Sequence, residues 1–207
     1  LFAGIGGIRL GFEQAFDNTI ETVFVSEIDN KAKETYSANF GDKPLIEGDI
    51  TKLSANEIPK FDICLAGFPC QAFSVAGKRL GFEDARGTLF YEFARVIKEA
   101  NPKVFIFENV KGLLNHDNGR TWQVIHDIFE ELGYDVHFKV LNSKDYGIPQ
   151  HRERLFCIGF RKKTKFVFPA PLPLEYIMYD FLEDYIDTKY FLREKGVKFV
   201  TSHKNRE

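Results

Sequence analysis

Apolar residues along this chain follow two periods that alternate from one end to the other. Short, nearly continuous apolar runs are typical of strands covered on both faces of a sheet. Such runs predict strands at residues 1–3, 22–25, 45–46, 61–66, 104–107, 134–141 and 155–160. The first of these runs indicates the end of a strand rather than a whole one.

Helical spacing of apolar residues separates these runs. One stripe begins at Ile8, a second follows Asp29, which is a suitable N-cap, and a third begins at Leu89. A fourth begins at Trp122 and stops before Gly133, a residue suited to a helix C-terminus. Strands that alternate with helices predict an α/β fold with a doubly wound, mostly parallel, Rossmann-like sheet.

The pattern changes after Phe168. Prolines at 169, 171 and 173 predict a linker, and residues 174–186 have the spacing of a short helix. We therefore expect a cofactor-binding and catalytic domain over 1–168 and a linker with a short helix over 169–187. Residues 188–207 are polar and mixed, and we expect them to begin a further region.

Composition excludes several classes of protein. The chain has 207 residues, of which 44% are hydrophobic and 28% charged, as in a soluble globular domain. It has no apolar run of the ~18 residues that span a bilayer and no signal-peptide layout, so we expect a cytoplasmic, prokaryotic-like protein. Three cysteines, an odd number, argue against a disulfide framework. We predict no metal site.

The net charge of −2 gives no general sign of a nucleic-acid partner. The charge is uneven, however, because the segment from Arg152 to Lys165 is rich in arginine and lysine and contains one acid, Glu153. Such a segment can bind phosphates even in a near-neutral protein. A solvated basic rim is an equally good explanation.

A glycine-rich turn follows the first predicted strand end. Glycines at 4, 6 and 7 let the backbone approach a ligand closely, and the helix that follows offers free N–H groups. Glu27, at the end of the next strand, is placed to accept hydrogen bonds from ribose hydroxyls, and Asp49 ends the third strand. These features predict an adenosine cofactor, although a tight turn with two surface acids remains an alternative. The spacing is not that of dinucleotide binding, which disfavours a nicotinamide oxidoreductase.

The three cysteines differ in their predicted positions. Cys64 and Cys157 lie within strands, where we expect them to be buried and structural. Cys70 follows a strand and Pro69, at the sheet edge where α/β proteins bind ligands. A long glycine-punctuated segment separates Cys70 from the next helix, near Thr88, and we predict that it is a lid.

An acid and two arginines complete the candidate chemistry. Glu108 ends an apolar strand, so we expect a poorly solvated carboxyl that can donate a proton near neutral pH. An exposed strand-end acid is the alternative. If the segment after Gln150 is extended, Arg152 and Arg154 share one face and suit an anion or a carbonyl oxygen.

The order and spacing of four motifs resemble those of bacterial DNA cytosine-5 methyltransferases of restriction–modification systems. The resemblance covers nearly all of residues 1–168. The motifs are Phe2-Ala3-Gly4-Ile5-Gly6-Gly7, Gly67-Phe68-Pro69-Cys70-Gln71-Ala72-Phe73-Ser74, Glu108-Asn109-Val110 and Gln150-His151-Arg152-Glu153-Arg154. Residues 81–90 also resemble the family's catalytic loop and the helix that follows it.

The resemblance implies a role for each matching residue. Cys70 would be the nucleophile, Glu108 would contact N3 and N4 of cytosine, Arg154 would contact O2, and Arg152 would support the site. Residues implied to hold S-adenosylmethionine, with S-adenosylhomocysteine as product, are Phe2, Ala3, Gly4, Ile5, Gly6, Gly7, Glu27, Ile28, Asp49, Ile50, Pro69 and Leu89. Residues implied to contact the substrate or to belong to the lid are Gln71, Ser74, Arg86, Asn109 and Gln150.

The implied partner is double-stranded DNA, from which the cytosine must be flipped out. Two alternatives stay open: a methyltransferase of the same superfamily that acts on cytosine in transfer RNA, and a non-catalytic DNA-binding or regulatory relative. The family's target-recognition region is not recognisable here. We expect a C-terminal segment or a second polypeptide to supply it, and the complete protein to be a monomer on DNA.

Overall fold

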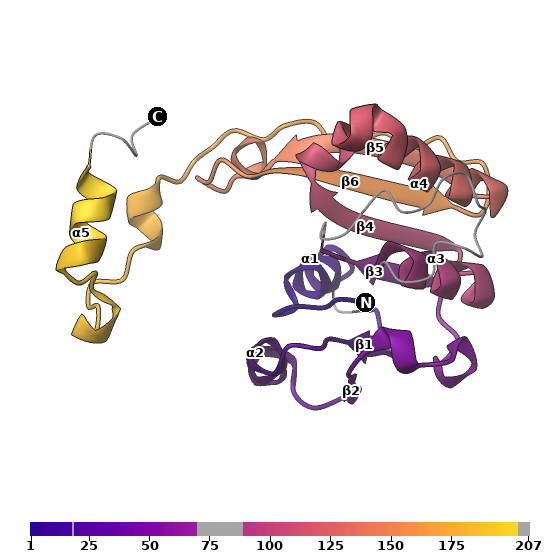
Figure 1. Ribbon diagram of the computed structural model, residues 1–207, viewed down its shortest axis with the longest axis horizontal. Coiled ribbons are helices and arrows are strands. Elements are labelled where there is room, and N and C mark those ends of the chain that lie inside the picture. Colours follow the sequence, from indigo (N-terminus) through magenta and orange to yellow (C-terminus); the bar gives the residue numbers. More distant parts are fainter. Residues whose placement is uncertain (18, 70–88, 203–207) are drawn as a thin grey trace.

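The computed structural model describes residues 1–17, 19–69 and 89–202. The helices and strands occur in the order α1 (Gly7–Ala15), β1 (Val25–Ser26), α2 (Asn30–Phe40), β2 (Ile46–Glu47), β3 (Ile63–Ala66), α3 (Leu89–Ala100), β4 (Val104–Val110), α4 (Arg120–Glu131), β5 (Asp135–Asn142), β6 (Glu153–Phe160) and α5 (Glu194–Thr201). Short 3₁₀ turns join several of them (Figure 1). None of the helices in the described ranges is long and apolar enough to cross a membrane.

The strands form two hydrogen-bonded groups. One has the order β3-β4-β6-β5, and the other is the parallel pair β1-β2. Residues 1–3 lie between them, because the Leu1 nitrogen donates to the Leu65 carbonyl (2.6 Å) and the Ala3 amide donates to the Ser26 carbonyl (3.0 Å). The predicted strand end at residues 1–3 does not form a strand, because Phe2 has φ 54°, but these residues join the two groups through the two hydrogen bonds.

The predicted doubly wound, mostly parallel sheet is confirmed, with one difference. β3 and β4 are parallel, whereas β6 is antiparallel to both β4 and β5. The reason lies in the connection: residues 143–152 join β5 to β6 with a short turn and no crossover helix, so the chain reverses direction. This reversal brings the start of β6 to the end of β4.

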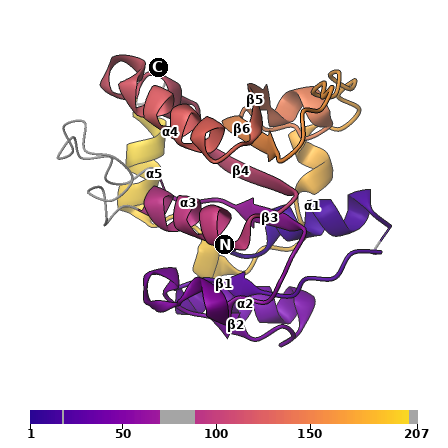
Figure 2. The same ribbon diagram turned by 90° about the vertical axis from the view of Figure 1, so that its right-hand side faces the viewer.

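Helices cover both faces of the sheet (Figure 2). α3 and α4 lie on one face and α1 lies on the other. Against the first face, Phe93 of α3 packs with Phe105 of β4 (ring centroids 5.8 Å apart) and with Phe129 of α4 (5.7 Å), and all three side chains are fully buried. Aromatic rings of this size contribute much of the stability of a core, so this cluster holds β3 and β4 in place.

Two predicted helix ends are confirmed. Asp29 caps α2, with its Oδ1 accepting from the Ala32 amide (2.7 Å). Gly133 follows α4 with φ 83°, and its amide donates to the Glu130 carbonyl (2.9 Å). Both boundaries follow from local side-chain chemistry, which is why the sequence predicts them.

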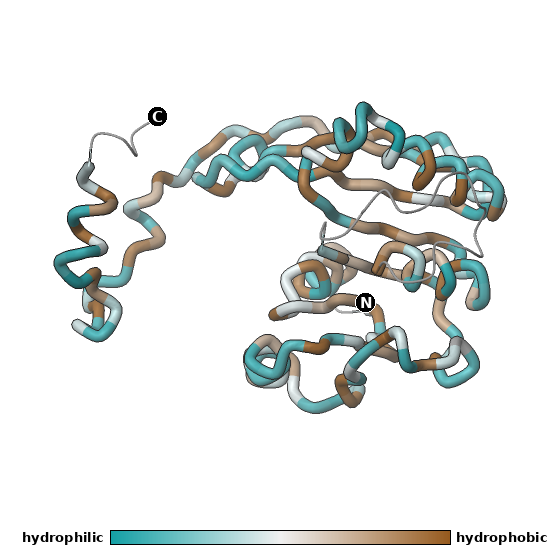
Figure 3. Tube along the Cα trace, viewed as in Figure 1, coloured by the Kyte–Doolittle hydropathy of each residue, from teal (hydrophilic) through white to brown (hydrophobic). Residues whose placement is uncertain are grey.

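Residues 169–202 extend away from the α/β body as an arm (Figure 1). The arm is attached near its start, because the Tyr146 hydroxyl donates to the Pro169 carbonyl (3.1 Å) and the Leu172 amide donates to the Asp145 carbonyl (2.8 Å). Of the short helix predicted over 174–186, a single 3₁₀ turn at Met178–Phe181 forms. The arm also contains α5, which the sequence does not predict. None of its residues is buried, and Phe199 is 67% exposed. The hydropathy colouring shows apolar and polar residues alternating along this arm (Figure 3).

Candidate active site

The candidate site lies along the carboxyl edge of the sheet. Glu27 directly follows β1, Asp49 lies just beyond β2, Pro69 lies beyond β3, and Glu108 is near the end of β4. Because β6 runs in the opposite direction, its first residues, including Arg154, meet the same edge. Parallel strands that end together gather polar side chains from distant parts of the chain, which is why α/β proteins bind ligands at this edge.

The glycine turn and Glu27 form one hydrogen-bonded unit. Gly4 has φ 54° and Gly6 has φ 92°, a backbone conformation that favours glycine. The Gly4 amide donates to Oε2 of Glu27 (2.7 Å), and the Asp29 amide donates to Oε1 (2.9 Å). The predicted turn and the predicted ribose acid are therefore in direct contact.

The neighbourhood of this turn fits an adenosine cofactor. A Cβ added at Gly4 would meet no atom within 4 Å, so open space faces the turn. Ile28, beside Glu27, is 68% exposed, which leaves an apolar side chain free to cover a flat ring. Phe2 is half-buried against Phe68 (centroids 6.2 Å apart). An open backbone cradle, a carboxylate and an exposed apolar cover together suit an amino-acid moiety, a ribose and a purine.

The other residues predicted to hold the cofactor lie around the same edge. Oδ1 of Asp49 accepts from the amide (3.0 Å) and the hydroxyl (2.7 Å) of Thr51, and these hydrogen bonds lower the pKa of Asp49 below its ordinary value. Ile50 is buried, whereas Ile5 and Pro69 are exposed. Leu89 is the first residue of α3.

The two described cysteines are buried, as predicted. Cys64 and Cys157 are free thiols within β3 and β6. Burial raises the pKa of Cys64 to about 11 and that of Cys157 well above its ordinary value. Neither thiol is suited to be a nucleophile at neutral pH, because the thiolate is the reactive form. Cys70 and the lid residues Gln71, Ser74 and Arg86 lie outside the described residues.

Glu108 meets both predicted arginines. Its Oε1 lies 2.9 Å from Nε of Arg154 and 3.7 Å from an Nη of Arg152. The strand register explains the contact: Arg154 pairs with Val110, so it lies diagonally across from Glu108 on the same face. The Glu108 side chain is 23% exposed, so the alternative of a fully exposed strand-end acid does not hold, and two guanidinium groups face the carboxyl. Its role as a proton donor stays a prediction.

Asn109 connects Glu108's strand to the segment that leads to Cys70. Its side chain is buried, and its Nδ2 donates to the Phe68 carbonyl (3.0 Å) while its Oδ1 accepts from the Val110 amide (2.8 Å). The resemblance places Asn109 among substrate or lid residues. In the structure its amide fixes the backbone two residues before Cys70.

This chain is similar to known proteins over most of its length. The family model for C-5 cytosine-specific DNA methylase matches residues 1–206. The chain belongs to this family. It is 51% identical over 200 residues to the Type II methyltransferase M1.ScrFI of Lactococcus lactis subsp. cremoris, covering 94% of this chain and 50% of that protein. It is 50% identical over 185 residues to M.HhaI of Haemophilus parahaemolyticus, covering 88% and 55%.

Solved structures show the same fold for this methylase chain. A structure of a Spodoptera frugiperda DNMT2 mutant matches with a TM-score of 0.75 at 23% identity, covering 96% of this chain and 63% of that one. A putative DNA modification methyltransferase encoded within an Escherichia coli prophage matches with a TM-score of 0.69 at 28% identity, covering 90% and 55%. The chain thus spans about half the length of the curated relatives described above.

Two residues that position the methylase site are missed by the sequence analysis. Oδ1 of the buried Asn142 accepts from the Arg152 amide (3.1 Å) and so fixes the backbone of the arginine pair. Arg95 of α3 donates to the carbonyls of Ile50 (3.1 Å) and Leu53 (3.0 Å). A polar residue at the end of a strand pattern is the only signal for Asn142, and such a signal is too common to be specific.

The basic segment that begins at Arg152 divides between the two edges of the sheet. Arg152 and Arg154 lie at the carboxyl edge of the methylase. Arg161 follows the other end of β6, where its Nη1 donates to the Asn101 carbonyl (2.6 Å) and its amide donates to the Lys103 carbonyl (3.0 Å). The basic residues of this segment therefore do not form one continuous phosphate-binding surface. Gln150 is exposed, in the turn before β6.

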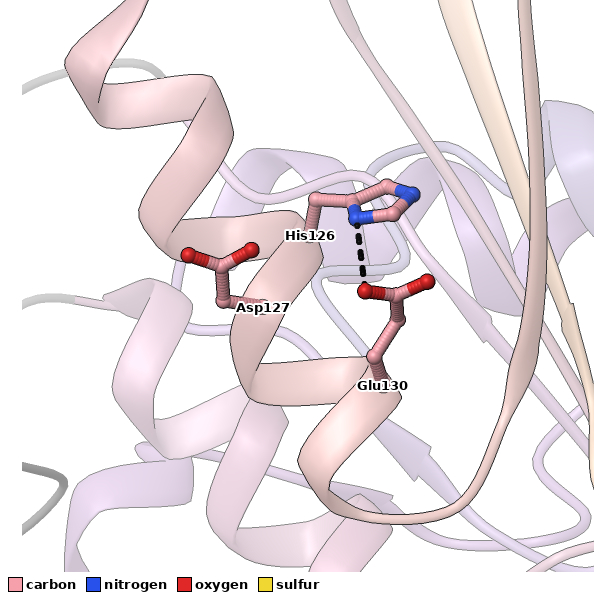
Figure 4. A group of neighbouring side chains, drawn as sticks. All are labelled: His126, Asp127 and Glu130. Carbon is pink, nitrogen blue, oxygen red and sulfur yellow. Dashed lines mark ion pairs between the residues drawn. The ribbon is translucent and has the colours of Figure 1, made fainter.

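Two further features are a cavity and a cluster of polar side chains. The cavity, of about 460 Å³, has residues 19–25 and 60–66 as its walls and is also lined by Phe2, Ala3 and Gly6, whereas Glu27 and Glu108 do not line it. On the surface of α4, Nδ1 of His126 lies 3.4 Å from Oε2 of Glu130, with Asp127 alongside (Figure 4). Asp127 and Glu130 are exposed, and neither feature brings a reactive group to the sheet edge.

Proposed function

We propose that the complete protein transfers a methyl group from S-adenosylmethionine to C5 of cytosine in double-stranded DNA, with Cys70 as nucleophile. The observation that carries the proposal is the junction at the carboxyl edge. Glu108 meets Arg154 at 2.9 Å, and the next residue, Asn109, holds the Phe68 carbonyl that leads to Cys70. A carboxyl, a guanidinium and a nucleophile segment are thus joined through adjacent residues of one strand.

The glycine turn, Glu27 and the residues around them would hold the cofactor. Glu27 already accepts two backbone N–H groups, so its orientation is fixed before a ribose arrives. Asp49, Ile28 and Phe2 would bind the adenine. When bound, S-adenosylmethionine supplies the methyl group.

Cytosine C5 is too weak a nucleophile to accept that group unaided. The thiolate of Cys70 adds to C6 and forms a sulfur–carbon bond, which makes C5 nucleophilic. Glu108, carrying a proton, donates to N3 and offsets the charge that develops on the ring. C5 would then take the methyl group, with the sulfur–methyl bond of the cofactor breaking and S-adenosylhomocysteine leaving. The C5 proton leaves to solvent, the bond between sulfur and C6 breaks and regenerates the Cys70 thiolate, and N3 returns its proton to Glu108.

Arg154 and Arg152 serve the same step electrostatically. Arg154 would donate to O2 of the base, where negative charge also accumulates during addition at C6. In the structure both guanidinium groups contact Oε1 of Glu108, and Oε2 is in neither ion pair. The carboxyl therefore keeps one oxygen available for the base while the other is held in place.

The substrate must present a cytosine outside the helical stack, because C6 is not accessible to a thiol within a duplex. We propose duplex DNA rather than transfer RNA, since relatives near 50% identity are named Type II methyltransferases. The likeness to DNMT2, at 23% identity, extends to the fold alone. A monomer on DNA and a cytoplasmic location remain predictions.

The direct test uses the complete natural protein with radiolabelled S-adenosylmethionine, offered duplex DNA and transfer RNA in parallel. We expect label in DNA, recovered as 5-methylcytosine after digestion. Label confined to RNA would establish the alternative substrate, and binding of DNA without label in either would support a non-catalytic relative.

Because the chain spans about half the length of the curated relatives described above, we expect the 207-residue chain alone to bind the cofactor weakly and to show little or no sequence-specific methylation. Robust site-specific methylation by this chain alone would contradict that expectation.

A further inference from the structure

A cluster of charged and aromatic side chains joins α1 to α2 behind the glycine turn. Arg9 of α1 donates from Nη1 to the Tyr36 hydroxyl (2.9 Å), and its Nε lies 2.6 Å from Oε1 of Glu13. Its guanidinium also lies over the Phe40 ring, 4.4 Å from the centroid. Tyr36 is 2% exposed, and the Arg9 and Glu13 side chains are 17% and 18% exposed. Because these side chains are largely shielded from water, the interactions of Arg9 with Glu13, Tyr36 and Phe40 are stronger than the same interactions on an exposed surface.

The same cluster contacts the turn itself. A Cβ added at Gly6 would come within 2.1 Å of Cε2 of Phe40, so the turn packs directly on this ring. Phe40 in turn packs against Tyr36 (centroids 4.8 Å apart). The Gly4–Glu27 hydrogen bond joins the other side of the turn to the start of α2. α1 and α2 are therefore connected at two places, one at the carboxylate and one behind it.

The two connections have a consequence for ligand binding. The turn and Glu27 belong to different elements, and their separation sets the distance between the groups that would hold the amino-acid moiety and the ribose. One hydrogen bond at the opening cannot fix that distance alone, because it does not define the angle between the helices. The Arg9–Tyr36–Phe40 cluster adds a second point of contact and fixes the angle.

We propose that Arg9, Tyr36 and Phe40 are positioning residues for the cofactor: they set the spacing between the glycine turn and Glu27 and thereby control affinity for S-adenosylmethionine. The inference rests on the proposed function. It adds a determinant of affinity that does not contact the ligand. A purely structural cluster would stabilise the fold without changing how the cofactor binds.

The test is Tyr36→Phe in the complete protein, which removes only the hydroxyl that accepts from Arg9. Calorimetry would measure the Kd of S-adenosylhomocysteine, and steady-state assays would measure KM for S-adenosylmethionine and kcat. We expect Kd and KM to rise about fivefold, less than the full contribution of one hydrogen bond to a charged group because only part of the loss reaches the ligand, with kcat at saturation within twofold. Arg9→Lys, which keeps the charge but not both hydrogen bonds, should give a similar rise.

Tyr134→Phe is the matched control. Tyr134 is also buried and donates its hydroxyl to the Pro102 carbonyl (2.8 Å), but at the opposite edge of the sheet. Burial raises the pKa of both phenols, that of Tyr134 to about 12, so both hydroxyls stay protonated in the assay. Both variants should lower Tm by a few degrees, on the order of 2–4 °C per kcal/mol lost, and only Tyr36→Phe should change Kd.

Two outcomes would overturn the inference: an unchanged Kd in both Tyr36→Phe and Arg9→Lys, or an equal change in Tyr134→Phe. Absence of S-adenosylhomocysteine binding by the unmodified protein would instead contradict the proposed function. The two failures are therefore distinguishable in one set of titrations.

Discussion

The two edges of the central sheet carry similar residue types in different surroundings. At the carboxyl edge, Glu108 and Arg154 form an ion pair with side chains 23% and 25% exposed. At the amino edge, Asp62 and Lys103 form a shorter pair, 2.7 Å, with side chains 71% and 67% exposed. Exposed pairs contribute little to stability because water solvates both charges. The distance within each pair therefore does not separate the two edges, whereas the exposure of the side chains does.

The difference arises from the direction of the strands. β3 and β4 end together, and β6 begins beside them, so residues from three distant segments converge at one edge. At the other edge, loops from different parts of the chain contact one another, as in the hydrogen bond from the Tyr134 hydroxyl to the Pro102 carbonyl. A pair of matched substitutions, one at each edge, can separate a role in catalysis from a role in folding.

The largest difference is expected between the two ends of β6. Arg154→Gln should lower kcat by about 10²–10³, because it removes a donor placed for charge that develops on the base. Arg161→Gln removes an arginine of comparable local bonding at the amino edge and should leave kcat within about threefold. Steady-state methylation of duplex DNA by the complete protein measures both. Equal losses of kcat in the two variants would mean that an arginine at the carboxyl edge contributes no more to catalysis than one at the amino edge.

The second-largest difference is expected in the reactivity of the three cysteine thiols. Because burial raises the pKa of Cys64 to about 11, its thiolate is scarce near neutral pH, and Cys157 is shielded in the same way. Iodoacetamide should label Cys70 at least ~100-fold faster than either, and the Cys70 rate should rise with pH through the ordinary thiol range. Mass spectrometry of the native protein gives the three rates.

Labelling in concentrated guanidinium, where all three thiols are exposed, is the control and should give comparable rates. Fast native labelling of Cys64 would show that it is less enclosed than its 5% exposure indicates.

A smaller difference is expected between two glycines with positive φ. Gly6→Ala should weaken S-adenosylhomocysteine binding about tenfold, because the new Cβ meets the Phe40 ring and the backbone at φ 92° disfavours alanine. Gly133→Ala, at φ 83° with nothing within 4 Å of its Cβ, should lower Tm through backbone strain alone and leave the Kd of S-adenosylhomocysteine unchanged. Calorimetry and thermal unfolding of both variants decide whether Gly6 acts on the cofactor or on the fold.

Much of the molecule follows from local sequence signals. The strands and helices of the body, the Asp29 cap and the Gly133 terminus depend on side chains within a few residues, so periodicity predicts them. The gathering of Glu27 and Glu108 at one edge also follows, because the carboxyl ends of parallel strands in an α/β sheet meet.

What the sequence does not predict depends on contacts between distant residues. The reversal of β6 follows from a short connection after β5, and the pairing of Glu108 with Arg154 follows from that reversal. The contact between Arg9 and Tyr36 joins two helices through residues 27 positions apart, and the spacing of apolar residues does not predict it. α5 has an apolar stripe, but none of its residues is buried, so its pattern gives no core to predict from.

The central claim is that Cys70 forms a covalent bond to C6 of cytosine at the edge that Glu108 and Arg154 define. DNA carrying 5-fluorocytosine tests it most directly, because fluorine at C5 cannot leave as a proton does and the adduct is trapped. With the complete protein and S-adenosylmethionine, we predict a denaturant-stable protein–DNA adduct that is absent in Cys70→Ser and retained in Cys157→Ala. Absence of an adduct under conditions where the DNA and cofactor both bind, or an adduct that persists in Cys70→Ser, would contradict it.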